Sequence, residues 1–287
     1  MSKEDFGKYF FSEDRIGADL KQQNVGDCYA VAAIHAMSCS PNFEVLCRSS
    51  MKKLHNGSWK VEVPLMSEDS ETITITQKEI SAQLNEKFLK LEKGSILPDL
   101  RGKLKPLQGN EGFRVLEAAF IKAKFGEVDR FSARGGSCTE VFSTLGGKNF
   151  VKYSVDSVTK NKKGKFVYPG LKHMPEEYHA NLDYYLESFD PEIRIATAAT
   201  KYETLNSYKE SWRNPLMPNH AYSIRSVDRE GKIVTVVNPL DTSKLIHFTF
   251  NEFKENFSCL QAVVINSPQL FFNMEYIEEK AARNKSL

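Results

Sequence analysis

The sequence predicts an α+β protein with two lobes, a helical N-terminal lobe (residues 1–150) and an antiparallel, β-rich C-terminal lobe (residues 151–287). In the first part, an apolar stretch at residues 27–37 and amphipathic stretches at 78–91 and 112–124 indicate helices. From about Phe150 onward, the apolar segments are short and β-like. A change of this kind along 287 residues, a length that permits one or two domains, favours two structural units.

The individual elements follow from local patterns. Residues 27–37 are apolar almost all round, so we expect a buried helix, with Asp27 as its N-cap. A second helix is expected over 42–54, and two alternating segments, 59–65 and 72–76, are expected to pair as strands across an acidic turn. The strands expected in the second lobe cover residues 150–155, 193–198, 221–227, 232–237 and 245–250.

Composition narrows the class of protein. Thirty-nine basic residues nearly balance thirty-seven acidic ones, and the net charge of +2 gives no argument for nucleic acid or an anionic membrane as the main partner. No run approaches the roughly 20 apolar residues that cross a bilayer, and the N-terminus has no secretory signal. We therefore expect a cytoplasmic protein with no membrane insertion; a microbial protein delivered into a host cytosol also fits these features.

The five cysteines are few and odd in number. They show neither C-x-x-C pairing nor metal-ligand spacing with histidine, so reduced thiols and no metal cofactor are expected. Cys28 differs from the others because it follows Gly26 and Asp27 at the predicted first turn of a buried helix. The partial positive charge and free N–H groups of a helix N-terminus stabilise a thiolate, so Cys28 is the candidate nucleophile. The others are expected to be inert, with Cys138 in a polar loop.

A catalytic cysteine needs a base, and His220 is the best candidate. It opens the predicted strand H-A-Y-S-I, so it would lie at a strand end on the lobe opposite Cys28. His35 is seven residues from Cys28, about 10 Å along the same helix, which is too far for a hydrogen bond. The remaining histidines are expected to be exposed or structural: His55, His173, His179 and His247.

Asn238 and a glutamine complete the candidate site. Asn238 ends a predicted strand before Pro239, and the turn D-R-E-G-K would bring it close to His220, where its amide can orient the imidazole ring. A side-chain amide six residues before Cys28 could form an oxyanion hole with the Cys28 backbone N–H. Spacing alone does not choose between Gln22 and Gln23.

These residues resemble the calpain family of cysteine proteases. The segment Q-Q-N-V-G-D-C-Y-A-V-A-A is similar to the calpain nucleophile motif Q-G-x-x-G-D-C-W, which places Gln22 on the oxyanion glutamine and Cys28 on the nucleophile. N-H-A-Y-S-I resembles G-H-A-Y-S-V, and V-V-N-P-L-D resembles R-N-P-W-G, which place the catalytic histidine on His220 and the catalytic asparagine on Asn238. Three further segments show the same order: L-E-A-A-F-I-K-A-K, G-G-S-C-T-E-V-F-S-T-L-G-G and F-N-E-F-K-E-N-F.

The resemblance runs from about Gln22 to Val264 and implies a papain-like fold with a protease core only. Three positions depart from the family: Tyr29 and Leu240 replace tryptophans, and Asn219 replaces the glycine before the histidine. The resemblance also implies that calcium dependence is possible. The sequence has no EF-hand motif to support it, so no cofactor is expected.

The function that the resemblance implies is endopeptidase cleavage of a protein or peptide substrate through a thioester acyl-enzyme at a Cys-His-Asn triad. Two alternatives remain open. The same triad can deamidate or transglutaminate a protein glutamine, and a catalytically silent cleft could bind a partner.

Overall fold

The structure of the chain is a computed structural model. It describes residues 1–12, 15–17, 19–23, 26–65, 70–81, 107–129, 133, 135–146, 151–155, 159–160, 166–167, 186, 189, 194–200, 216–217 and 219–264. Within these residues the fold is mixed α+β, with helices and antiparallel sheets, as expected.

The first part of the chain is mainly helical. Its elements are α1 (Lys3–Phe10), β1 (Phe11–Ser12), β2 (Arg15–Ile16), α2 (Cys28–Ser38), α3 (Phe43–Ser50), β3 (Met51–Lys53), β4 (Trp59–Val63), β5 (Glu71–Ile75), α4 (Gln77–Ser81), α6 (Glu111–Phe125), α7 (Cys138–Val141) and a π-helical turn η2 (Phe142–Gly146). Strands β3, β4 and β5 form an antiparallel sheet, which confirms the predicted strand pair. The helix predicted at 112–124 is α6; that predicted at 78–91 is described only as α4, and its remainder lies outside the described residues.

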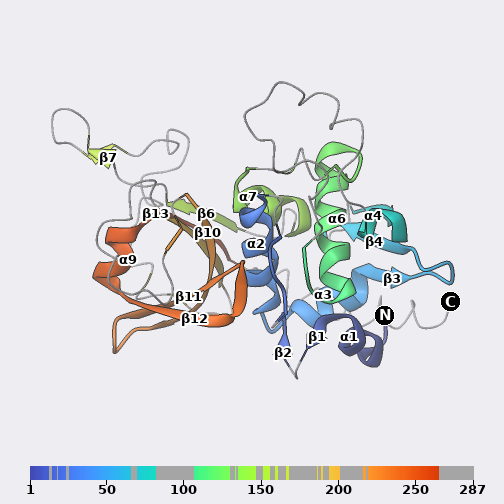
Figure 1. Cartoon of the computed structure of the whole chain (residues 1–287), viewed down its shortest axis with the longest axis horizontal. Helices are drawn as coiled ribbons and strands as arrows, with labels where there is room; N and C mark the ends of the chain where they lie inside the picture. The colour runs from blue at the N-terminus through green and yellow to red at the C-terminus, as the bar shows by residue number, and fades with distance from the viewer. Residues whose placement is uncertain are drawn as a thin grey trace.

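Helix α2 confirms the helix predicted at residues 27–37. Its side chains from Tyr29 to Ser38 are all buried, because it lies between the large sheet and the other helices (Figure 1). An apolar surface all round the helix is what this central position requires. Asp27 occupies the N-cap position, but its backbone (φ −102°, ψ 30°) is not extended and its side chain makes no capping hydrogen bond.

The helix predicted at residues 42–54 is wrong beyond Ser50. Met51 turns to an extended conformation (φ −124°, ψ 134°) and begins β3, which pairs with β4 at Met51–Val61. Pairing with a strand ten residues further along the chain thus ends the helix. The helical periodicity of residues 42–54 does not depend on this pairing and therefore could not predict where the helix ends.

The second part contains a six-stranded antiparallel sheet in the order β12-β11-β10-β9-β13-β6. Its strands are β6 (Val151–Val155), β9 (Arg194–Thr200), β10 (Ala221–Asp228), β11 (Ile233–Asn238), β12 (Asp241–Thr249) and β13 (Phe257–Val264); β7 (Thr159–Lys160) and β8 (Phe166–Val167) form a separate pair. The five predicted strands are confirmed. Helix α9 (Phe250–Asn256) joins β12 to β13 and begins with a capping box between Thr249 and Glu252.

Two clusters of buried apolar residues stabilise the fold. One surrounds α2 and α6 and includes Ile195 and Ala221 from the sheet. The other lies between the sheet and α9 and includes Tyr222, Phe248 and Phe253. The first cluster contains residues from both parts of the chain, so these clusters do not test the lobe boundary expected at residue 150, which stays a prediction. Among the described residues, no helix combines the length and apolar character needed to span a membrane.

Candidate active site

Cys28 is the first residue of α2, where the helix packs against the large sheet. The thiol is half-buried and lies within hydrogen-bonding reach of the backbone N–H of Ala221, the residue that follows His220. The fold therefore brings Cys28 to the start of β10, although almost 200 residues of chain separate the two.

The environment of Cys28 changes its pKa in both directions. Burial raises the pKa of the thiol and is the largest effect; the Asp27 carboxylate raises it further. The backbone N–H groups of Ala221, Tyr29 and Cys28 lower the pKa. The backbone N–H groups at the helix start therefore favour a thiolate, but burial outweighs them, and the net effect is a raised pKa for the Cys28 thiol.

His220 and Asn238 are in direct contact. The His220 Nε2 and Asn238 Oδ1 atoms are 2.9 Å apart, because antiparallel pairing of β10 with β11 brings the start of one strand to the end of the other. Burial lowers the pKa of His220, and the hydrogen bond to Asn238 partly opposes this. With Nε2–H donating to Asn238, Nδ1 is the acceptor nitrogen of the neutral ring.

The backbone of His220 is also fixed. Its N–H donates to Thr200 Oγ1 on β9 at 3.0 Å, and its ring makes an edge contact with Tyr222. Asn219, just before it, has a φ of 51°. Asparagine tolerates this left-handed conformation better than most residues, so the position before His220 does not require a glycine.

Asn238 is the last residue of β11 and precedes the tight turn that joins β11 to β12. Its Oδ1 accepts a second hydrogen bond, from the Leu240 N–H at 2.9 Å. The two bonds together fix the orientation of the amide, with the oxygen toward the ring. The side chain of Leu240 itself is 37% exposed.

The structure separates the two candidate glutamines. With its amide oxygen turned toward α2, Gln22 accepts from the Cys28 N–H at 3.1 Å and from the Asp27 N–H at 3.3 Å. Gln23 instead donates from Nε2 to Gln108 Oε1 at 3.1 Å. Gln22 is therefore the glutamine whose amide contacts the backbone of Cys28.

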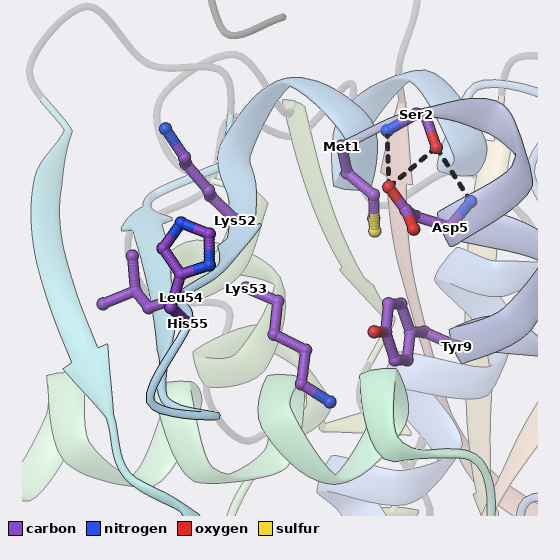
Figure 2. A pocket seen from close by; sticks show the side chains of 8 residues that line it. All are labelled: Met1, Ser2, Asp5, Tyr9, Lys52, Lys53, Leu54 and His55. Carbon is purple, nitrogen blue, oxygen red and sulfur yellow. Dashed lines mark hydrogen bonds between the residues drawn. The ribbon is translucent and has the colours of Figure 1, made fainter. Parts of the chain in front are cut away.

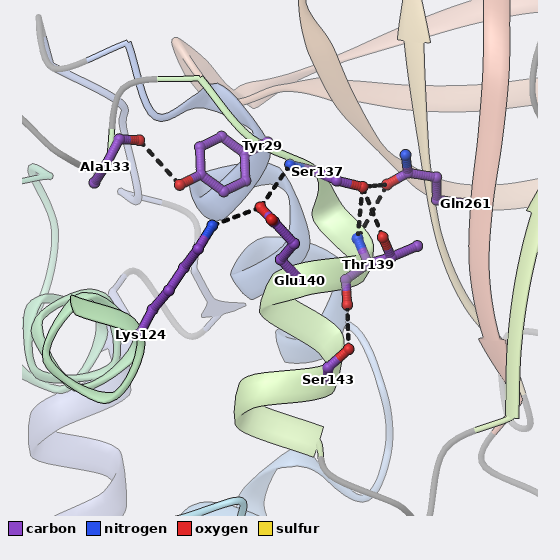
Figure 3. A network of polar contacts seen from close by, with 8 residues as sticks. All are labelled: Tyr29, Lys124, Ala133, Ser137, Thr139, Glu140, Ser143 and Gln261. Atoms are coloured by element: carbon purple, nitrogen blue, oxygen red, sulfur yellow. Dashed lines mark hydrogen bonds and ion pairs between the residues drawn. The ribbon is translucent and has the colours of Figure 1, made fainter. Parts of the chain in front are cut away.

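Tyr29, the residue after Cys28, fixes the loop that contains Ala133 (Figure 3). It is 3% exposed, and its hydroxyl donates to the Ala133 carbonyl at 2.9 Å. A Cβ on Gly136 would lie 2.6 Å from the Tyr29 ring, so only glycine fits there. Gly135 donates its N–H to the Gly26 carbonyl at 3.1 Å, which ties this loop to the segment just before Cys28.

The start of α7 links this loop to the large sheet (Figure 3). The Ser137 hydroxyl and the Thr139 N–H both donate to Gln261 Oε1 on β13, each at 3.1 Å. Glu140 accepts from the Ser137 N–H and pairs with Lys124 on α6 at 2.7 Å. The polar network thus joins the helices to the sheet close to Cys28.

The other histidines and cysteines take different positions. His35 is buried against Ser223, His247 is exposed and bonded to Thr235, and His55 is exposed; His173 and His179 lie outside the described residues. None of the five cysteines, all of which lie among the described residues, forms a disulfide. Cys138 is buried at the start of α7 rather than in a polar loop, because the Ser137–Glu140 capping box begins a helix there.

A pocket of about 460 Å³ lies apart from these residues, between α1 and the end of β3 (Figure 2). Lys52, Lys53 and His55 line one side, and Asp5 and Tyr9 line the other. Lys53 is already held by an ion pair with Glu111 at 2.7 Å. In the part of the chain that the structure describes, no group of three or more His, Cys, Asp or Glu side chains is placed to hold a metal ion.

Sequence reasoning missed the residues that hold the candidate site together. Thr200 fixes the His220 backbone, and Thr242 bonds to the segment before Gln22. Threonines are common and carry no motif, and both lie at least twenty residues from the group they hold. Only the sheet topology brings them there.

Comparison with known proteins adds no family: no protein-family model matches the chain, and no curated protein matches its sequence.

Proposed function

We propose that the chain is a papain-like cysteine protease of two lobes, similar to the protease core of calpains. The observation that carries the proposal is the 2.9 Å bond from His220 Nε2 to Asn238 Oδ1, beside a cysteine that begins a buried helix. The proposed lobes are residues 1–150, whose helices include α2 and α6, and residues 151–287, which contain the six-stranded sheet. The helical lobe contributes Cys28, and the β-rich lobe contributes His220 and Asn238.

In the first step, a substrate carbonyl lies beside Cys28. The Sγ atom forms a bond to the carbonyl carbon while its proton passes to Nδ1 of His220. Burial of both groups favours the neutral thiol and imidazole at rest, so proton transfer accompanies the attack. Asn238 keeps the ring oriented, since its amide oxygen accepts the Nε2–H and leaves Nδ1 as the nitrogen that can take the proton.

The carbonyl oxygen becomes negatively charged as the S–C bond forms. When its amide is turned over, Gln22 directs its N–H groups to the same side as the Cys28 N–H, and both can donate to this oxygen. The tetrahedral intermediate then collapses, and His220 protonates the leaving amine. Water attacks the thioester, transfers a proton to His220 and releases the acid.

The proposal is tested by mass spectrometry of a casein substrate incubated with the protein, with and without calcium. Peptide-bond hydrolysis gives new chain ends and the mass of one water per cut. Deamidation gives a gain of about one dalton, and transglutamination with an added amine gives an adduct. Either product without chain cleavage would contradict the protease proposal and support the alternative reaction of the same triad. If no product forms and Cys28 is unreactive, the result would contradict the protease proposal and support a catalytically inactive cleft that binds a partner. Cys28→Ala is the control for contaminating proteases.

The two glutamines offer a matched pair of variants. Gln22→Ala is expected to lower kcat by about 100-fold, the usual effect of removing one oxyanion donor. Gln23→Ala removes the same amide one residue away, where it bonds Gln108, and is expected to change kcat less than twofold. Equal losses in both variants would contradict the assignment of Gln22.

A further inference from the structure

The segment that presents Gln22 is held from two sides. On the helical side, Lys21 and Gln108 exchange both backbone hydrogen bonds at 2.8 Å. On the sheet side, the Gln22 N–H donates to the Pro239 carbonyl at 2.6 Å. The position of Gln22 relative to Cys28 therefore depends on the turn that follows Asn238.

Thr242 makes the main side-chain contact between that turn and the segment. Its hydroxyl lies 2.6 Å from the Leu20 carbonyl and 3.0 Å from the Gly17 carbonyl, and the side chain is 6% exposed. The nearby ion pair between Lys21 and Asp241 is longer, at 3.8 Å, with both side chains about one-third exposed, so it adds little. The buried hydroxyl is therefore the stronger of the two side-chain links.

We propose that Thr242 is a positioning residue for the oxyanion hole: by binding the carbonyls of Gly17 and Leu20, it fixes the segment from which Gln22 faces Cys28. This inference rests on the proposed function. Asn238 has its own anchors, the Leu240 N–H and the β11 strand, so the His220–Asn238 pair does not depend on the Thr242 hydroxyl. Loss of that hydroxyl should impair the oxyanion hole and spare the nucleophile and base.

Two reagents test the oxyanion hole and the Cys28–His220 pair independently. Iodoacetamide alkylates Cys28 when Sγ displaces iodide from a methylene carbon, a step that produces no oxyanion. The peptide aldehyde acetyl-Leu-Leu-norleucinal instead forms a hemithioacetal: Sγ bonds to the carbonyl carbon, and the carbonyl oxygen gains negative charge and then a proton. Aldehyde affinity therefore reports the oxyanion hole, and alkylation rate reports Cys28 and His220.

The experiment compares full-length wild type with Thr242→Val, a nearly isosteric change that removes the donor. We expect the aldehyde inhibition constant to rise by about tenfold, less than for direct loss of the Gln22 donor, with the alkylation rate within twofold of wild type. Thr242→Ser retains the donor and should restore most of the aldehyde affinity. Combining Thr242→Val with Gln22→Ala should weaken binding no further than Gln22→Ala alone, because both changes remove the same interaction.

Thr74→Val, on an exposed face of β5, is the matched control for the chemical change. Wild-type aldehyde affinity in Thr242→Val would overturn the inference while leaving the proposed function intact. Parallel losses in aldehyde binding and alkylation, or failure of the Thr242 variants to fold, would assign Thr242 a purely structural role and also overturn it. If wild type itself binds no aldehyde or is not alkylated at Cys28, the proposed function fails, and this inference fails with it.

Discussion

His35 makes the stability of the protein depend on pH. It lies on α2, is 5% exposed, and its Nδ1 is 2.7 Å from Ser223 Oγ on β10. Burial, with a smaller contribution from the charge of Arg225, lowers the pKa of His35 from 6.5 to about 4. The unfolded chain therefore takes up a proton below about pH 6.5 that the folded protein excludes until about pH 4.

The sign and size of the effect follow from this difference. The contribution of His35 to stability is fully present above about pH 6.5 and is lost as the pH drops toward 4, since protonation of His35 favours the unfolded chain. A change of one unit in pKa corresponds to about 1.36 kcal/mol, so His35 alone should reduce the unfolding free energy by about 2 kcal/mol between pH 7 and pH 5. The change reaches about 3 kcal/mol by pH 4.

Urea unfolding at pH 7, 6 and 5 measures this effect in wild type and His35→Gln. Glutamine can still bond Ser223 but does not titrate in this range. Carboxylates with lowered pKa, such as Glu111 and Asp241, weaken both proteins equally in acid, so the difference between the two curves isolates His35. Curves that stay parallel from pH 7 to pH 5 would refute the reasoning.

Further variants test the site and its surroundings. Asn238→Ala should lower kcat by roughly 10- to 100-fold with little change in KM, because a misoriented His220 ring impairs the chemical step; an unchanged kcat would contradict this role. Gly136→Ala should reduce the unfolding free energy by about 1–3 kcal/mol, since its Cβ would lie 2.6 Å from the Tyr29 ring. Gly7→Ala, in α1 with open space around it, should instead stabilise by up to about 1 kcal/mol, and the same sign for both changes in thermal unfolding would contradict the packing argument.

Local patterns predicted the elements that carry the candidate site. The apolar stretch behind Cys28 is a buried helix, and the two strands that end at His220 and Asn238 are neighbours, as their short turn indicated. Asn-Pro ended the strand where the sequence placed its end. These features depend on residues close together in the chain, which is why the sequence could report them.

Features that depend on residues far apart in the chain could not be predicted from local sequence patterns. Residues beyond Ser50 leave the helix because β4 pairs with them. Burial of Cys28 against the sheet makes its pKa higher than a helix start alone would give. Spacing left Gln22 and Gln23 equivalent; the motif resemblance favoured Gln22, and the contacts of Gln22 with Cys28 and of Gln23 with Gln108 distinguish them in the structure.

The proposed function requires Cys28 to be a nucleophile activated by His220. The most direct test is labelling of the protein with an epoxysuccinyl peptide probe, followed by mass-spectrometric mapping of all five cysteines. We expect a single modification at Cys28, absent in Cys28→Ala and slowed by about 100-fold or more in His220→Ala, the usual effect of removing a general base. Equal labelling of the other cysteines, or no labelling of Cys28 at any pH or calcium concentration, would contradict it.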